Sequence, residues 1–285
     1  MAKLPEMHEP LLRRRVALMA ERILPSSALY PGLLALVLIV FGWQLSPVED
    51  LSEPITEPVV SEQTPIAVFP DFAAVVEIDE RKQQFFQFLR GYIDAANAEV
   101  LETRQQLKRY DEIAASGSRF SPTERAWILA LADEYDVDTS ELFEWEITSE
   151  LMRRVDEVPL AMALAQAANE SAWGTSRFAL EGNNIFGQWC FESGCGLVPL
   201  QRQGSASYEV RKFESIGESV RAYIKNINSQ YSYEELRELR ARMRRRNEPL
   251  NAFDLAAGLS AYSERGENYV DEVQNLILQN ELDRL

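Results

Sequence analysis

The chain has 285 residues, enough for one full domain with additional segments. Acidic residues outnumber basic ones by 45 to 29, and the formal net charge of −16 argues against a nucleic-acid-binding protein, which needs a basic surface. The single histidine, His8, lies near the N-terminus, and there are only two cysteines. The composition therefore excludes a Ser-His or Cys-His relay and a His- or Cys-rich metal cluster.

Residues 28–45 form an apolar run in which Gln44 is the one strongly polar residue and Trp43 marks one edge. Eighteen residues are just enough to cross a bilayer. Residues 1–27 are basic and the residues after the run are acidic, so the positive-inside rule places the N-terminus in the cytoplasm. A cleaved signal peptide and a buried core helix are the alternatives. An uncleaved signal anchor is favoured, because no small-residue cleavage site follows Leu45.

Residues 46–70 contain five prolines among acidic residues and indicate an extended linker. Residues 71–119 carry an aromatic-rich helical pattern, which predicts one or two helices packing on the domain that follows. The sequence Ser121-Pro122-Thr123-Glu124 is typical of a helix start, and Leu142–Val155 predicts a second helix.

The stretch from Pro159 to Gly187 is the centre of the chain. It begins with a helix that is apolar nearly all round, which predicts burial, and near the end of that helix stands Glu170. Burial disfavours an ionised carboxylate, so the pKa of Glu170 should be raised. A protonated carboxylic acid near neutral pH is the group a glycosidase needs to protonate a leaving oxygen. The alternative is a helix-terminal Glu in a salt bridge.

The pattern changes after Gly187. Residues 188–191, 196–201 and 207–213 predict the short strands of an antiparallel sheet, with Cys190 and Cys195 in its first hairpin. Ser215 with Glu218, and Ser232 with Glu235, indicate two further helix starts. The second of these helices ends in a basic run, residues 240–246, that suggests a solvated face or a surface for carboxylates or lipid headgroups. Residues 251–259 and 268–282 predict the last two helices.

The motifs ESAWG (170–174) and NNIFG (183–187) resemble the glucosaminidase family of bacterial wall hydrolases, similar to glycoside hydrolase family 73, and most closely its Bax-like branch. The resemblance covers roughly residues 120–285. It implies a lysozyme-like, mostly helical α+β catalytic domain with a small β-lobe, and it implies that Glu170 is the catalytic acid. In AYSERGENYV (261–270), Tyr262 corresponds to a family tyrosine in the cleft; a core tyrosine is the alternative.

The remaining candidate site residues each have an alternative interpretation. A second carboxylate of the β-lobe could be Glu192, Glu209 or Glu214, or the 2-acetamido group of the substrate could replace it. Sugar contacts are expected from four residues, with core packing or turn formation as their alternatives: Trp173, Asn184, Phe186 and Trp189.

The sequence thus predicts a hydrolase of the β-1,4 bond after N-acetylglucosamine in peptidoglycan. It is expected in the bacterial inner membrane with residues 28–45 in the bilayer and the catalytic domain in the periplasm. That compartment is oxidising, which predicts a disulfide between Cys190 and Cys195. No metal, cofactor or nucleic acid is expected, and protein partners are unknown. A lytic transglycosylase or muramidase on the same fold, and a catalytically silent wall-binding protein, are the alternatives.

Overall fold

The computed structural model describes residues 69–200 and 207–285, which fall within one compact unit. The predicted tail (1–27) and membrane span (28–45) lie outside the described residues, and so does the predicted linker (46–70) up to residue 68. Within the described part no helix is long and apolar enough to cross a membrane. The elements in chain order are η1 (Phe72–Ala74), α2 (Ile78–Ala115), α3 (Pro122–Glu134), α4 (Glu144–Arg154), α5 (Leu160–Ser171), α6 (Arg177–Gly182), β1 (Trp189–Cys190), β2 (Gly196–Leu197), β3 (Glu209–Arg211), α7 (Ile216–Ser229), η2 (Tyr231–Tyr233), α8 (Glu234–Arg245), α9 (Ala252–Ala256), η3 (Ala257–Leu259), α10 (Glu267–Gln279) and η4 (Leu282–Arg284).

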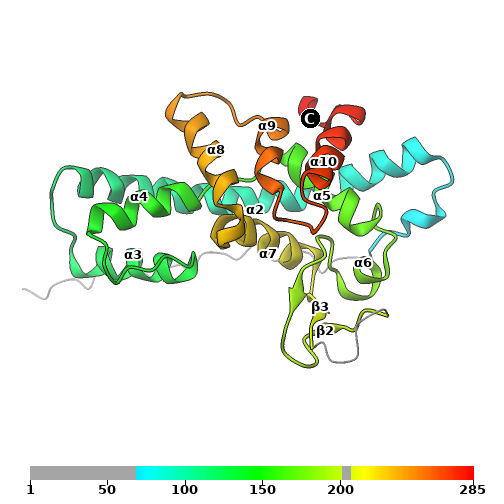
Figure 1. The fold of residues 1–285 in the computed structure, drawn as a ribbon, viewed down its shortest axis with the longest axis horizontal. Helices are drawn as coiled ribbons and strands as arrows, with labels where there is room; N and C mark the ends of the chain where they lie inside the picture. The colour runs from blue at the N-terminus through cyan, green and yellow to red at the C-terminus, as the bar shows by residue number, and fades with distance from the viewer. Residues whose placement is uncertain (1–68, 201–206) are drawn as a thin grey trace, which may run out of the picture. The chain divides into compact units, whose positions relative to one another are not determined.

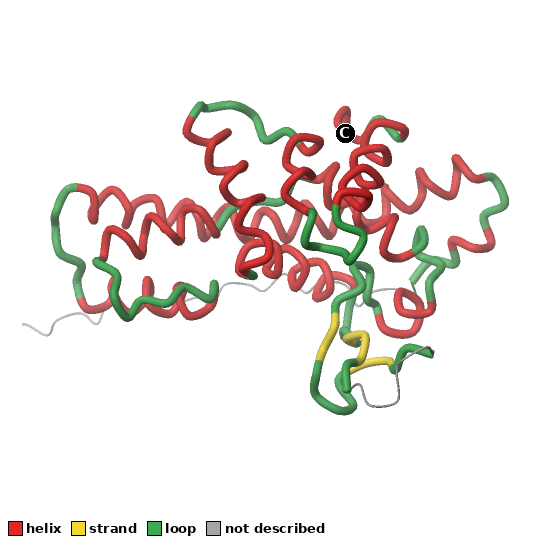
Figure 2. Tube along the Cα trace, viewed as in Figure 1, coloured by secondary structure: helices red, strands yellow, loops and turns green. Residues whose placement is uncertain are grey.

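Most of the described chain is helical, and its strands are confined to one small sheet (Figure 2). This confirms the predicted α+β, mostly α class and fits a lysozyme-like domain with a β-lobe.

Helix α2 is a single helix of 38 residues that contributes to two hydrophobic clusters. Its N-terminal half, around Phe85 and Leu89, joins the larger cluster, which also contains α5, α7, α9 and α10. Its C-terminal half, around Leu107, joins a smaller cluster with α3 and α4. Figure 1 shows α3 and α4 beside that C-terminal half. Contacts therefore cross the boundary predicted between residues 119 and 120.

The predicted helix starts have different outcomes. Ser121 and Glu124 form the reciprocal capping box in front of α3, as predicted. Ser215 caps α7 by accepting a hydrogen bond from the backbone N–H of Glu218. The prediction for Ser232 is wrong, because residues 231–233 form a 3₁₀ turn and α8 starts at Glu234 without a side-chain cap.

Helix α5 is the buried centre of the larger cluster, as its apolar sequence predicts. Residues 161–168 are all buried, and the helix packs against α2, α9 and α10. Small Ala side chains such as Ala163 and Ala167 let neighbouring helices approach closely, so water is excluded from most of the helix surface. This packing places the last turn of α5, with Glu170, in largely apolar surroundings.

The sheet has the strand order β1-β3-β2, and both pairs are antiparallel. Val210 in the central strand lies opposite Trp189 on one side and Leu197 on the other. Because β1 and β2 each pair with β3 and not with each other, the predicted first hairpin is wrong. The disulfide between Cys190 and Cys195 joins the end of β1 to the residue before β2.

The basic run at the end of α8 is not a continuous solvated face. Arg240 is 1% exposed and donates to the backbone carbonyls of four residues: Arg153, Arg154, Asp156 and Glu157. Arg244 makes two hydrogen bonds of 3.0 and 2.8 Å to the buried carboxylate of Asp156. These two arginines fasten α8 to the end of α4, and only the others of the run remain for solvent or partners.

Candidate active site

Glu170 lies in the last turn of α5 and lines a groove of about 990 Å³. The groove walls come from the segment after α6, from α7 and from the loop before α10. Among the lining residues are Phe186, Trp189, Tyr233, Tyr262 and Arg265. The Oε1 atom of Glu170 is buried and has no hydrogen-bond partner among the described residues. A buried carboxyl oxygen without a partner is rare in a folded protein and therefore needs an explanation such as a functional role.

Burial raises the pKa of Glu170 above its ordinary value. The neighbouring hydroxyl of Tyr269 and the positive charge of Arg265 oppose this upward shift, while the negative charge of Glu272 adds to it. Arg265 and Glu272 form an ion pair with each other, so their effects on Glu170 partly cancel. The net upward direction agrees with the prediction from the apolar helix.

The chain turns sharply directly after Glu170. Ala172, Trp173 and Gly174 all have positive φ angles, of 50°, 60° and 76°. Two successive non-glycine residues in this region are strained and need strong local support. Ser171 supplies part of it, because its buried hydroxyl donates to the Ala167 carbonyl and accepts from the Gly174 N–H. The motif ESAWG therefore encodes a tight turn that ends α5 at the groove.

Trp173 does not lie in the groove. Its ring makes edge contacts with Phe85 and Phe86 of α2, with centroids 5.9 and 5.3 Å apart, and Lys82 lies over it. The ring therefore packs on α2, and Trp173 is not among the residues that line the groove. This placement is core packing and does not support the predicted sugar contact.

Asn184 is also a structural residue in its present surroundings. It is 1% exposed, its amide N–H groups donate to the carbonyls of Gln188 and Arg211, and its Oδ1 accepts from the Gln188 N–H. All of these bonds hold the turn that leads into β1, so no donor is left over for an acetamido group. Turn formation, the alternative interpretation, accounts for Asn184.

Phe186 and Trp189 do line the groove, as predicted. Phe186 is 2% exposed and stacks on Tyr223 at a centroid distance of 3.8 Å, so it offers only an edge to a ligand. Trp189 is 51% exposed and rests edge-on against Tyr208. Of the two, Trp189 has the open aromatic surface that a pyranose ring needs.

Tyr262 has features of both roles considered for it, a tyrosine in the cleft and a tyrosine in the core. It lines the groove, and its ring also stacks on the buried Tyr269 at 5.2 Å. Its hydroxyl donates a hydrogen bond of 2.9 Å to the backbone carbonyl of Phe186. Burial raises the pKa of Tyr262 well above its ordinary value, so the hydroxyl stays protonated. Tyr262 thus connects the loop before α10 to the opposite wall of the groove.

None of the three β-lobe carboxylates lines the groove. Glu192 and Glu214 are exposed elsewhere. Glu209 is 5% exposed, and its carboxylate accepts hydrogen bonds from the backbone N–H groups of Gly194 and Gly196. It holds the turn before β2, so the placement favours a structural role. This corrects the expectation that one of the three stands beside Glu170.

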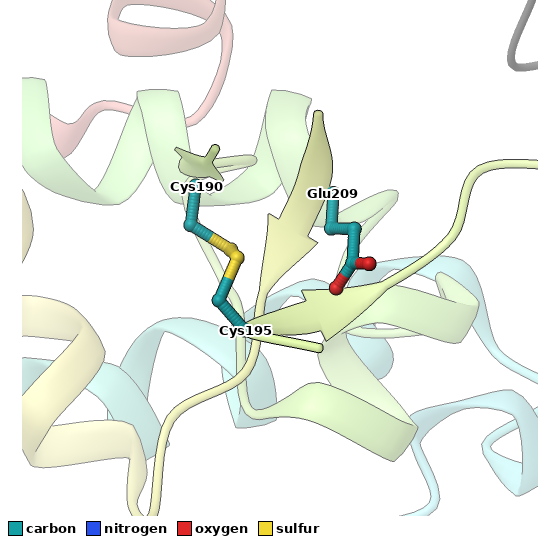
Figure 3. Close-up of side chains that lie close together, drawn as sticks. All are labelled: Cys190, Cys195 and Glu209. Carbon is teal, nitrogen blue, oxygen red and sulfur yellow. A yellow bond between two sulfur atoms is a disulfide. The ribbon is translucent and has the colours of Figure 1, made fainter. Parts of the chain in front are cut away.

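Glu209 lies close to the disulfide of Cys190 and Cys195 (Figure 3). Two cysteines and a glutamate could in principle bind a metal, but a disulfide has no thiolate to offer. The Cα atoms of the two cysteines are 6.2 Å apart, within the normal range for a disulfide. Glu209 and the disulfide therefore have a structural role and stabilise the β-lobe.

The sequence analysis missed several residues of the site. Glu134, Asp136 and Lys225 also line the groove, although the sequence analysis gives none of them a role. Gln166, a buried polar residue one helical turn before Glu170 and outside the groove lining, was overlooked as part of an apolar helix. A polar residue four positions from a candidate acid on an otherwise buried helix is the signal that could have found it.

Comparison with known proteins agrees with this geometry. Residues 145–282 match the glucosaminidase family, described as mannosyl-glycoprotein endo-beta-N-acetylglucosaminidase. The chain is also 32% identical over 202 residues to protein bax of Escherichia coli (strain K12), an alignment that covers 70% of each protein. The catalytic domain of the autolysin Auto from Listeria monocytogenes aligns with 62% of the chain and 95% of its own length, at 17% identity and a TM-score of 0.31.

An acid on a buried helix at the edge of a groove is the arrangement of a glycosidase. The chain belongs to the glucosaminidase family, and within that family it is Bax-like. The family match begins inside α4, so α2 and α3 lie before it.

Proposed function

We propose that this protein hydrolyses the β-1,4 bond after N-acetylglucosamine in peptidoglycan, with Glu170 as the general acid. The observation that carries the proposal is the position of Glu170, which lines the groove with a buried and unpartnered Oε1 in a chain of the glucosaminidase family. Burial raises the pKa of this carboxyl group toward the pH at which a general acid is most effective.

The reaction needs one proton donor and one group that stabilises the anomeric carbon. Glu170 donates its proton to the glycosidic oxygen as the bond between that oxygen and the anomeric carbon breaks. Because the β-lobe carboxylates stand outside the groove, the carbonyl oxygen of the substrate's 2-acetamido group is the proposed second participant, and it bonds to the anomeric carbon. Water then attacks that carbon, the bond from the acetamido oxygen to it breaks and restores the acetamido group, and the Glu170 carboxylate takes up the proton of the water.

Two other residues have proposed parts in this reaction. Trp189, with its exposed indole at the groove edge, would stack on a sugar ring. Tyr262 would hold the groove wall at Phe186 in the position that fits the acetamido group, since its hydroxyl bonds to the carbonyl of that residue.

Mass spectrometry of the products from purified peptidoglycan tests the proposal. The full-length protein should release fragments with N-acetylglucosamine at the reducing end, and Glu170→Gln should lower the rate by roughly 10²- to 10⁴-fold. Fragments ending in anhydro-muramic acid would identify a lytic transglycosylase, and reducing muramic ends a muramidase. Binding without release of fragments would identify a silent wall-binding protein. A folded Gln variant with near wild-type activity would exclude Glu170 as the acid.

A further inference from the structure

The cations that line the groove differ in whether a carboxylate neutralises them. Lys225 forms an ion pair of 3.0 Å with Glu134, and Arg265 forms one with Glu272. Arg211 also lines the groove, but it forms no ion pair with any residue that the structure describes. The whole chain has a net charge of −16, so carboxylates are plentiful. A groove arginine that none of the described carboxylates neutralises therefore needs an explanation.

The backbone and side chain of Arg211 are both held in place at the end of β3. Its N–H donates to the carbonyl of Gln188 at 2.9 Å, and its own carbonyl accepts from the side-chain amide of Asn184 at 2.8 Å. The guanidinium lies over the ring of Phe213, 5.0 Å from the ring centroid, while the residue as a whole is exposed. A side chain restrained in this way loses less conformational entropy when it binds a ligand.

Arg211 lies next to the indole that is proposed to stack on a sugar ring. Trp189 in β1 lies opposite Val210, the residue before Arg211 in β3. Trp189 and Arg211 are thus at neighbouring positions of two paired strands, and both line the groove. A sugar on the indole would carry its substituents along the wall of the groove that holds the guanidinium.

We propose that Arg211 is a specificity-determining residue that binds a carboxylate attached to the muramic acid ring of the glycan. A guanidinium can hold a carboxylate through two parallel N–H···O bonds, which makes the contact strong and directional. In peptidoglycan the carboxylate belongs to the lactyl side chain of muramic acid or to the peptide joined to it. A polymer of N-acetylglucosamine alone has neither. This inference rests on the proposed function, because it names the substrate feature that the same groove recognises.

The test measures equilibrium binding to full-length Glu170→Gln, so that the ligands stay intact, and to the same protein with Arg211→Gln added. The ligands are disaccharide peptides from peptidoglycan and the same molecules after their carboxylates have been converted to amides. Protein that keeps Arg211 should bind the carboxylate form about tenfold or more tightly, because the amide form loses a charge-assisted contact. With Arg211→Gln the two forms should bind alike.

A third ligand identifies the source of the carboxylate. The peptide-free disaccharide carries a free lactyl carboxylate and no peptide. If Arg211→Gln weakens its binding about as much as that of the disaccharide peptides, the lactyl group is the source. If the substitution weakens only the disaccharide peptides, the peptide is the source. Either result supports a carboxylate site at Arg211.

Two further variants separate the site from a general effect of charge. Arg109→Gln removes an exposed arginine of α2 that is outside the groove lining and has no ion pair with a described residue. This control should keep the full preference for the carboxylate form. Arg211→Lys retains the charge but not the planar fork, so it should keep only part of the preference. A role limited to packing on Phe213 would change stability and leave the preference intact.

Three results would overturn the proposal: equal binding of the carboxylate and amide forms to protein that keeps Arg211, binding of neither form, or an undiminished preference in Arg211→Gln. The first two need no substitution at position 211, so they apply even if Arg211→Gln does not fold. Cleavage is followed separately with the wild type. A carboxylate preference without cleavage would refute the enzymatic function alone, and cleavage without the preference would refute the role of Arg211 alone.

Discussion

Burial of Glu170 has a consequence for stability as well as for catalysis. Because burial raises its pKa in the folded protein, the protonated form is favoured by folding, and that contribution is lost as the pH rises through the folded pKa. Glu170→Gln is neutral at every pH and escapes this loss. The melting temperature of the variant should exceed that of wild type at neutral pH, and the gap should narrow in acid. The check is thermal unfolding of both proteins over a series of pH values. Equal melting temperatures of wild type and Glu170→Gln at every pH would show that folding does not disfavour the ionised carboxylate.

Tyr262→Phe tests the bond between the two groove walls. The change leaves the carbonyl of Phe186 without its donor, which should lower the free energy of unfolding by about 1 kcal/mol. The groove wall can then shift, so turnover on purified peptidoglycan should fall by more than that stability loss explains. Denaturant unfolding and a turnover assay on the same preparation measure both effects. Full turnover together with lowered stability would make Tyr262 a core residue only.

At the scale of single residues, the role of a residue can be predicted from the sequence when a short contiguous motif surrounds that residue. Glu170 was found because ESAWG surrounds it on an apolar helix. Trp173 and Asn184 were assigned to sugar binding because aromatic and amide side chains suit sugars, yet the same side chains suit a core and a turn. Only the ring contacts of Trp173 and the three hydrogen bonds of Asn184 decide between these roles, and neither can be read from spacing.

Helices α4 and α8 are held together by a buried ionic cluster around Asp156. Burial alone would raise the pKa of Asp156, but the hydrogen bonds from Arg244 and the charges of Arg240 and Arg104 outweigh it and lower the pKa. Asp156→Asn would leave the buried Arg240 without its carboxylate partner and Arg244 with Glu157 alone, and it should lower the free energy of unfolding by about 3 to 5 kcal/mol. Arg242→Gln, on the exposed side of α8, is the control and should change little.

The same cluster gives a defined pH dependence. A carboxylate with a lowered folded pKa stabilises the protein above its unfolded pKa, about 3.9 for Asp, and this stabilisation is lost as the pH falls through the folded value. The stability difference between wild type and Asp156→Asn should therefore be full at neutral pH and shrink in strong acid. If the stability difference between wild type and Asp156→Asn stays constant down to the pH at which the protein unfolds in acid, the effect of the substitution comes from packing and not from charge.

At the scale of elements, long periodic segments were predictable and short ones were not. The 38-residue helix α2, and α3 with its Ser121 cap, carry enough turns or a specific cap for the pattern to be unambiguous. Strands β1 and β2 have two residues each, which is too short for alternation to show, so their pairing with β3 was missed. The six-residue α6 went unpredicted for the same reason.

At the scale of the whole molecule, the distribution of charge carries a prediction about topology. Basic residues, Arg13, Arg14, Arg15 and Arg22, precede the apolar run 28–45, and acidic residues follow it at once. Among residues 69–200 and 207–285, which the structure describes, no helix is long and apolar enough to cross a membrane. The proposed substrate lies outside the cytoplasmic membrane, and a peptidoglycan hydrolase must reach it.

The positive-inside rule therefore predicts an N-terminus in the cytoplasm and residues 46–285 in the periplasm. A reporter that is active only in the periplasm, fused after Leu285, should be active, and a reporter that is active only in the cytoplasm should be silent at the same position. Replacing the four arginines with glutamate removes the excess of positive charge in front of the apolar run. This change should reduce the periplasmic signal, because the charge before the first span usually decides its orientation. Cytoplasmic activity of the wild-type fusion would contradict both the topology and the peptidoglycan substrate, since the catalytic groove would then never meet the wall.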